Sequence, residues 1–189
     1  MECDWEVELG GDAAAIDANW QGFIDLRFAP ESAAALPETQ QLPALADALV
    51  RLNTCSPVWT TKCDVWSVDG VDPDELNAPP ETAAYADACY IDLLPAGAHL
   101  WSTAQSAVAW CKQQCEILRQ RPMRCCRADL IVRHAMVSAE RLDVGITAYF
   151  TGCGATQVDA AHALSMALSA FAESVHSTGS DSLTDSKRD

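Results

Sequence analysis

Apolar residues recur at every second position from Leu142 to Phe150, the pattern of a strand that is buried on one face. The segment 128–136 alternates in the same way, and Ser138-Ala139-Glu140 separates the two, so we predict an antiparallel hairpin. After Gly152-Cys153-Gly154 the spacing of the apolar residues changes to three and four, which predicts a helix packed on the apolar side of the hairpin. The residues of that helix face are Val158, Ala161, Leu164, Leu168, Phe171 and Val175.

The same patterns divide the rest of the chain into strands and helices. Strands are expected at 3–9, 24–28, 58–68 and 84–94, a short helix at 12–19, a loop at 29–41, and longer helices at 43–53 and 102–120. The order is ββα-ββα-ββα, which predicts an α+β fold with a mainly antiparallel sheet and helices on one face. A ferredoxin-like arrangement is the nearest architecture. We expect a single domain over 1–175 and a disordered tail over 176–189, where apolar periodicity ends.

Composition narrows the class of protein. Nearly half of the residues (49%) are apolar and six are tryptophan, which excludes a globally disordered chain. No apolar run approaches the roughly 18 residues that cross a membrane, and the acidic first residues lack the pattern of a signal peptide. We therefore expect a cytoplasmic protein whose nine cysteines are free thiols rather than disulfides.

The negative charge is concentrated in the first half of the chain. Up to Leu100 there are 18 acidic and three basic residues, whereas the remainder holds nine of each. A field of this sign repels nucleic acid and anionic membranes, so we expect neither as a partner, and it attracts basic proteins. A role in solubility alone is the alternative. The predicted binding residues are the acids of the first strand and of the turn-rich loop after 68, namely Asp4, Glu6, Glu8, Asp69, Asp72, Asp74 and Glu75.

The basic residues are clustered between 112 and 133, around the end of one helix and the following strand. Because the acidic half of the molecule can neutralise them, we assign them a structural role rather than a nucleic-acid patch. In the strand at 84–94, Asp87 and Asp92 interrupt an otherwise apolar sequence. Either one of them is buried with a partner or the strand lies at an edge of the sheet.

Cys153 is the thiol with the most suggestive position for chemistry. It lies between two glycines and just before a predicted helix, whose N-terminal dipole can lower the pKa of a thiol. A catalytic cysteine also needs a base, and His134 and His162 are the candidates. An ordinary glycine-containing turn between strand and helix explains the same sequence without catalysis.

The other cysteines give weak support for a metal site. Cys111 and Cys115 lie on the apolar stripe of their helix, where we expect them to pack as small hydrophobic residues. Cys125-Cys126 could join them in a zinc site, but the chain contains no C-x-x-C pair. Dinucleotide-binding, P-loop and zinc-protease motifs are also absent, so we predict neither a metal nor a cofactor.

These observations favour a non-enzymatic binding protein with an acidic surface. One concrete form is a protein that neutralises a basic partner, as bacterial immunity proteins do to toxins. The alternatives are a small thiol- or metal-dependent enzyme using Cys153, and a structural subunit that self-associates through an exposed sheet edge. The sequence leaves the oligomeric state open and resembles no named family.

Overall fold

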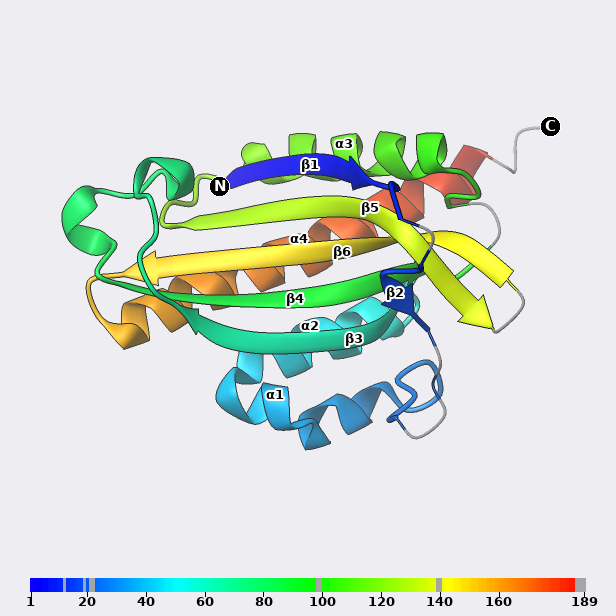
Figure 1. The fold of residues 1–189 in the computed structure, drawn as a ribbon, viewed down its shortest axis with the longest axis horizontal. Coiled ribbons are helices and arrows are strands. Elements are labelled where there is room, and N and C mark those ends of the chain that lie inside the picture. Colours follow the sequence, from blue (N-terminus) through cyan, green and yellow to red (C-terminus); the bar gives the residue numbers. More distant parts are fainter. Residues whose placement is uncertain (12, 19, 21–22, 98–99, 139–140, 186–189) are drawn as a thin grey trace.

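Six strands form one sheet in the computed structural model, which describes residues 1–11, 13–18, 20, 23–97, 100–138 and 141–185 (Figure 1). The strands are β1 (Glu2–Glu8), β2 (Ile16–Asp17), β3 (Val58–Val68), β4 (Tyr85–Pro95), β5 (Cys126–Ser138) and β6 (Arg141–Gly154). The helices are α1 (Pro37–Gln41), α2 (Pro43–Asn53), α3 (Ala104–Arg119) and α4 (Gln157–Asp185), with 3₁₀ turns η1 (Pro30–Ala35), η2 (Asp74–Leu76) and η3 (Pro80–Thr82). The predicted α+β class is confirmed.

The strands follow the spatial order β1-β5-β6-β4-β3, and the short β2 also pairs with β5. The contacts β5–β6, β6–β4 and β4–β3 are antiparallel, whereas β1 and β2 run parallel to β5. The sheet is therefore mixed. The chain enters it at one edge with β1, and the strand beside that edge, β5, is supplied more than a hundred residues later.

The predicted hairpin is confirmed as β5 and β6, which pair from Cys126 opposite Gly152 to Ser138 opposite Arg141. The turn residues 139–140 lie outside the described part of the chain. Alternate side chains of β6 (Ile146, Ala148 and Phe150) are fully buried, as the period-2 pattern predicts.

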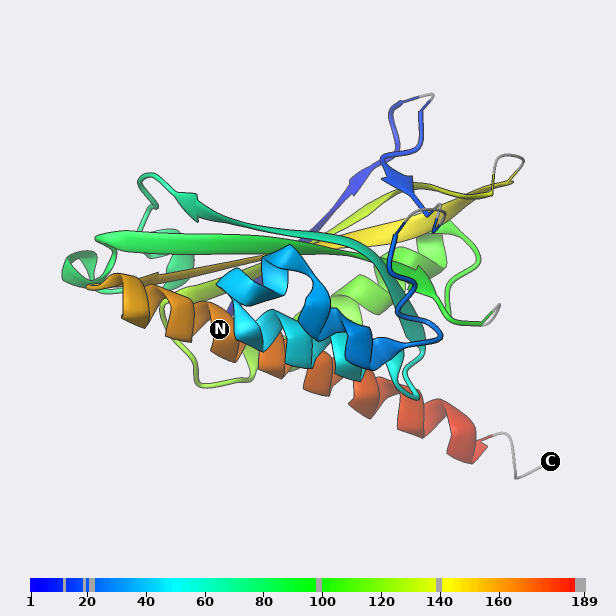
Figure 2. The same ribbon diagram turned by 90° about the horizontal axis from the view of Figure 1, so that it is seen from below.

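One face of the sheet carries the helices (Figure 2). In α4 the residues against the sheet include Leu164, Leu168, Phe171 and Val175, all fully buried, and the Phe150 and Phe171 rings lie 5.1 Å apart. Val158 was expected on this face but is 78% exposed, because the buried stripe of α4 begins at Ala160. Cys111 and Cys115 of α3 are fully buried in the same core, as predicted.

The predictions for the first forty residues are wrong in several places. The segment 24–28 is a turn rather than a strand, and the second strand of the first unit is Ile16–Asp17, within the segment predicted as a short helix. The predicted loop 29–41 contains η1 and α1, both of which start at prolines. The ββα order is thus not confirmed in detail, nor is a ferredoxin-like arrangement.

The last helix is longer than predicted. α4 continues to Asp185, ten residues past Val175, and so enters the segment expected to be a disordered tail. That segment contains no proline, and its one glycine, Gly179, costs a helix only about 1 kcal/mol. Within the described residues, no helix combines the length and the apolar character needed to cross a membrane.

Gly152 allows α4 to pack directly on β6. A Cβ atom at this position would lie 2.8 Å from the backbone oxygen of Ala160 and even closer to the backbone nitrogen of Leu164. Both are main-chain atoms of α4, so no side chain can rotate away to make room. The helix can approach the strand this closely only where the strand has no side chain.

We expect Gly152→Ala to destabilise the fold by about 1–3 kcal/mol, because α4 must move away from β6. Urea denaturation measures the loss of unfolding free energy. Gly10→Ala is the matched control, since a Cβ there meets nothing within 4 Å. Equal stability of the two variants would contradict the packing described for α4.

Candidate functional site

Three aromatic side chains meet on the sheet face opposite the helices. They are Trp66 of β3, Tyr90 of β4 and Tyr149 of β6, with ring centroids 5.8–6.4 Å apart. Tyr90 and Tyr149 are register partners in the antiparallel pair, and Trp66 is 39% exposed. We call these three residues the aromatic trio. Accessible aromatic side chains on a sheet face are typical of a binding surface.

Two loops cover the ends of this face and leave its centre open. At one end Ile16 and Ala18 pack on Leu94 and Ala135. At the other end Leu76 and Ala78 cover Ala86 and Cys153. By register the aromatic trio lies between the two ends. Among the described residues, α1–α4 lie on the other face of the sheet (Figure 2). We refer to this surface as the open face.

A chain of polar contacts crosses the open face from β4 to β1. The Thr147 hydroxyl donates to Asp92 Oδ1 at 2.6 Å, and Arg133 Nη1 donates to Tyr149 Oη at 3.0 Å and to Thr147 Oγ1 at 3.4 Å. Arg133 also donates through Nε and Nη2 to Glu8 Oε2 at 2.9 and 2.7 Å. Arg133 therefore links the N-terminal edge strand to the centre of the sheet.

Asp92 is the buried carboxyl group of this network. Only 5% of the residue is exposed, and the loss of solvation raises the pKa of its carboxyl group to about 6. The Thr147 hydroxyl and the positive charges of Arg133 and Lys62 act in the opposite direction. Asp87 is buried as well and accepts hydrogen bonds from Gln157 at 2.6–2.7 Å. The prediction that an acid of this strand is buried with a partner is confirmed for both residues.

Beside the aromatic trio the open face is hollowed under the loop that follows β3. The hollow has a volume of about 490 Å³ and is bordered by residues of β1, β5 and β6, by Val68 at the end of β3 and by residues 70–72, 75 and 76 of the loop. Its charged residues are Glu6, Asp72, Glu75, Asp129 and Arg127. Arg127 and Asp129 bind each other at 2.7–2.9 Å, which leaves three carboxylates without a basic side chain in the lining. We call this cavity the acidic hollow.

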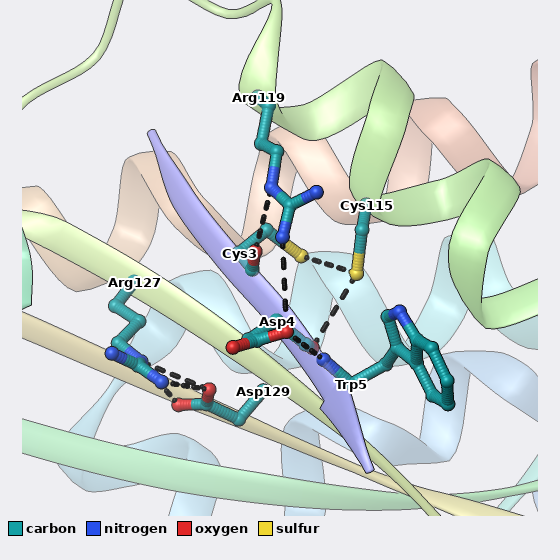
Figure 3. A network of polar contacts seen from close by, with 7 residues as sticks. All are labelled: Cys3, Asp4, Trp5, Cys115, Arg119, Arg127 and Asp129. Carbon is teal, nitrogen blue, oxygen red and sulfur yellow. Dashed lines mark hydrogen bonds and ion pairs between the residues drawn. The ribbon is translucent and has the colours of Figure 1, made fainter.

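Contacts with α3 hold β1 in place (Figure 3). The same contacts determine which acidic side chains of β1 are already ion-paired. Arg119 donates from Nε to the Cys3 carbonyl at 2.9 Å, and its Nη2 lies 3.7 Å from Asp4 Oδ1. The sulfur atoms of Cys3 and Cys115 are 3.0 Å apart in the core. Asp4 is therefore ion-paired with α3, while Glu6 has no ion pair among the described residues.

The predicted binding acids separate into two groups in the structure. Glu6, Asp72 and Glu75 line the acidic hollow together. Asp4 and Glu8 are engaged by Arg119 and Arg133, and Asp69 and Asp74 are exposed outside the lining of the hollow. Reasoning from the sequence missed the aromatic trio. Its members are the polar-side residues of their strands, but the order of strands that brings them together is not visible in the sequence.

Four arginines of the basic cluster form ion pairs, as a structural role implies. Arg119 pairs with Asp4, Arg121 with Glu173, Arg127 with Asp129 and Arg133 with Glu8. Two of the four partners belong to the acidic first half of the chain. Exposed pairs of this kind contribute little stability, so their main effect here is to cancel positive charge.

The predicted catalytic residues are only partly brought together. Cys153 and His162 border a common cavity of about 410 Å³, whereas His134 lies opposite Val144, eight residues along β6 from Gly152 and thus roughly 26 Å away. Cys153 is buried, and burial, with help from the neighbouring Cys125, raises the pKa of its thiol to about 11. The pKa of this thiol is thus shifted in the direction opposite to the expected lowering by the helix dipole.

Among the described residues, no three histidine, cysteine, aspartate or glutamate side chains are arranged to hold a metal ion. All nine cysteines are free. Comparisons with protein-family models, with curated protein sequences and with solved structures found no match.

We expect one thiol to react rapidly with Ellman's reagent at neutral pH, that of Cys55, because Cys55 is the exposed cysteine. Burial keeps the thiols of Cys63, Cys126 and Cys153 protonated, with pKa values raised to about 11 or 12. The fast phase should disappear in Cys55→Ser and persist in Cys153→Ser. If it disappears in Cys153→Ser instead, Cys153 is reactive and the thiol enzyme is favoured.

We expect Asp92→Asn to stabilise the protein at about pH 8 by on the order of 2–3 kcal/mol, and to have little effect at about pH 4. The pKa of Asp92 is raised to about 6 in the folded state. Its ionisation therefore lowers the free energy of unfolding as the pH rises from the ordinary pKa of an aspartate to about 6. Asparagine keeps an oxygen acceptor for the Thr147 hydroxyl. Urea denaturation at both pH values, with the exposed Asp64→Asn as control, measures the difference. An equal effect at both pH values would show that the ionisation of Asp92 does not lower the free energy of unfolding.

Proposed function

We propose that this protein acts by binding a basic protein through its open face, without chemistry of its own. The observation that carries this proposal is the position of the aromatic trio next to the acidic hollow, on the face opposite the described α-helices. Aromatic groups supply contact area at low entropic cost, and unpaired carboxylates favour a cationic partner. The most specific form of the proposal is a neutralising, immunity-like protein that masks a basic partner.

The distribution of charge supports a basic partner over other classes. The net charge is −15, and the excess lies in the first hundred residues, which supply three of the four carboxylates of the acidic hollow. Such a field accelerates encounter with a cationic protein and repels polyanions. A cytoplasmic location fits the free cysteines and is part of the proposal.

An enzyme using Cys153 is the second candidate, and one observation favours it. Cys153 and His162 border the same cavity of about 410 Å³, together with Cys125 and Met166. The raised pKa of the Cys153 thiol argues against it, since the thiolate is the nucleophile. The open face has no comparable obstacle, so binding remains the preferred function.

We expect a basic partner to be recovered from an extract of the native host at low ionic strength. The decisive measurement uses the identified partner in purified form. Its affinity should fall about tenfold or more between roughly 50 and 300 mM salt, because screening shortens the reach of the charges that attract it.

The double variant Asp72→Asn/Glu75→Gln should weaken this complex, since both carboxylates border the acidic hollow. The matched control is Glu31→Gln/Asp47→Asn, which removes the same charge from two exposed residues of η1 and α2. Equal weakening by both variants would mean that net charge alone drives binding. Affinity that is independent of salt would contradict the proposal altogether.

A further inference from the structure

We propose that the acidic hollow receives the side chain of a single arginine of the partner, with the guanidinium group held between the carboxylates and Tyr149, the member of the aromatic trio that borders the hollow. This inference rests on the proposed function and makes it more specific. It identifies the group of the partner that is recognised and the residues of this chain that recognise it.

The shape of the hollow suits one long side chain. Its volume of about 490 Å³ lies within the range of roughly 300–1,000 Å³ that is typical of sites for small ligands. The apolar Ile131 and Leu76, 7% and 3% exposed, contribute to its lining, and the Tyr149 ring borders it. An entering side chain would therefore meet apolar surface along its methylene groups and charged groups near its end.

The charged side chains that line the hollow favour a cationic ligand. Arg127 is neutralised by two-oxygen contact with Asp129 at 2.7–2.9 Å, and it stays charged because this contact raises its pKa. The remaining carboxylates are those of Glu6, Asp72 and Glu75. Asp72 uses Oδ1 to accept the backbone N–H of Asp74 at 3.0 Å, while its other oxygen has no such bond among the described contacts. A guanidinium group offers five donors to such a set of oxygens.

The aromatic trio favours arginine over lysine. A guanidinium group is planar and weakly hydrated, and it stacks on aromatic rings more readily than an ammonium group does. The protein already uses this contact, since Arg27 lies 3.4 Å from the ring centre of Trp20 and Arg133 lies 5.5 Å from that of Tyr149. Trp66 is the exposed member of the trio, and among the described residues no cation lies over its ring. Trp66 does not line the hollow, but its ring centroid lies 6.4 Å from that of Tyr149, so it is the ring open to a side chain at the rim of the hollow.

The test uses three short peptides that differ in two side chains: Ac-Gly-Arg-Arg-Gly-NH₂, the same peptide with lysine, and the same peptide with citrulline, a neutral isostere of arginine. Nuclear magnetic resonance titration follows the indole N–H of Trp66, assigned with Trp66→Phe. We expect the arginine peptide to shift this signal and to saturate. The lysine peptide should bind about threefold or more weakly, and the citrulline peptide should not bind. Equal affinity for arginine and citrulline would overturn the inference.

Variants locate the binding site of the peptide. Glu6→Gln/Glu75→Gln should weaken the arginine peptide about threefold or more, and Trp66→Ala should do the same. Glu81→Gln/Asp47→Asn removes two charges from exposed residues outside the lining of the hollow and should leave the affinity unchanged. Circular dichroism establishes that each variant is folded. If the two charge variants have equal effects, the hollow is not the site.

The failure of this inference and that of the proposed function give different results. If the purified partner binds with the expected salt dependence but is insensitive to Trp66→Ala and Glu6→Gln/Glu75→Gln, the protein binds a basic partner elsewhere and the arginine site is wrong. If the arginine peptide binds as expected but the identified partner is insensitive to salt, the arginine site stands and the proposed function fails.

Discussion

The close packing of α4 on β6 at Gly152 is the contact on which the arrangement of the molecule depends. Because the main chains approach at Ala160 and Leu164, the helix buries Phe150 against Phe171 and brings the apolar side of the central strand into the core. The other long helices continue the same layer. The main core therefore lies on one side of the sheet, and on the opposite side only the two ends are covered by apolar clusters, which leaves the central residues of that side without a helix packed on them.

The open face is therefore where selection for something other than stability can act. Its central residues are a mixture that packing alone does not explain: three aromatic rings, a buried carboxyl group with a raised pKa, and an arginine that joins β1 to β6. A buried, ionisable Asp92 opposes folding at neutral pH, whereas a leucine would not. Polar groups that reduce stability in this way are commonest at surfaces that have a function.

Much of the fold could be predicted from the sequence, because the longer elements have clear periodicity. The hairpin β5–β6 and the helices α2 and α3 lie where the pattern indicates. The segment 24–28 alternates like a strand, yet it is a turn, because Asp25 Oδ1 accepts the backbone N–H of Arg27 at 3.1 Å and Arg27 stacks on Trp20. For the candidate site, the sequence indicated the acids. It could not indicate that Arg133 engages Glu8, which lies 125 residues earlier, while Glu6 remains unpaired among the described residues.

The parallel pairing of β1 with β5 also has a consequence for how the chain reaches its native state. Glu2 pairs with Arg127 and Glu8 with Arg133, so β1 has no sheet partner until β5, more than a hundred residues later in the chain, is available. Contacts over such sequence separations slow folding, since the intervening chain must be closed into a loop. Alternating acids such as those of β1 are charges of the kind that discourages an unpaired strand from pairing with other copies. The acids of β1 are thus suited to protecting this strand before β5 pairs with it.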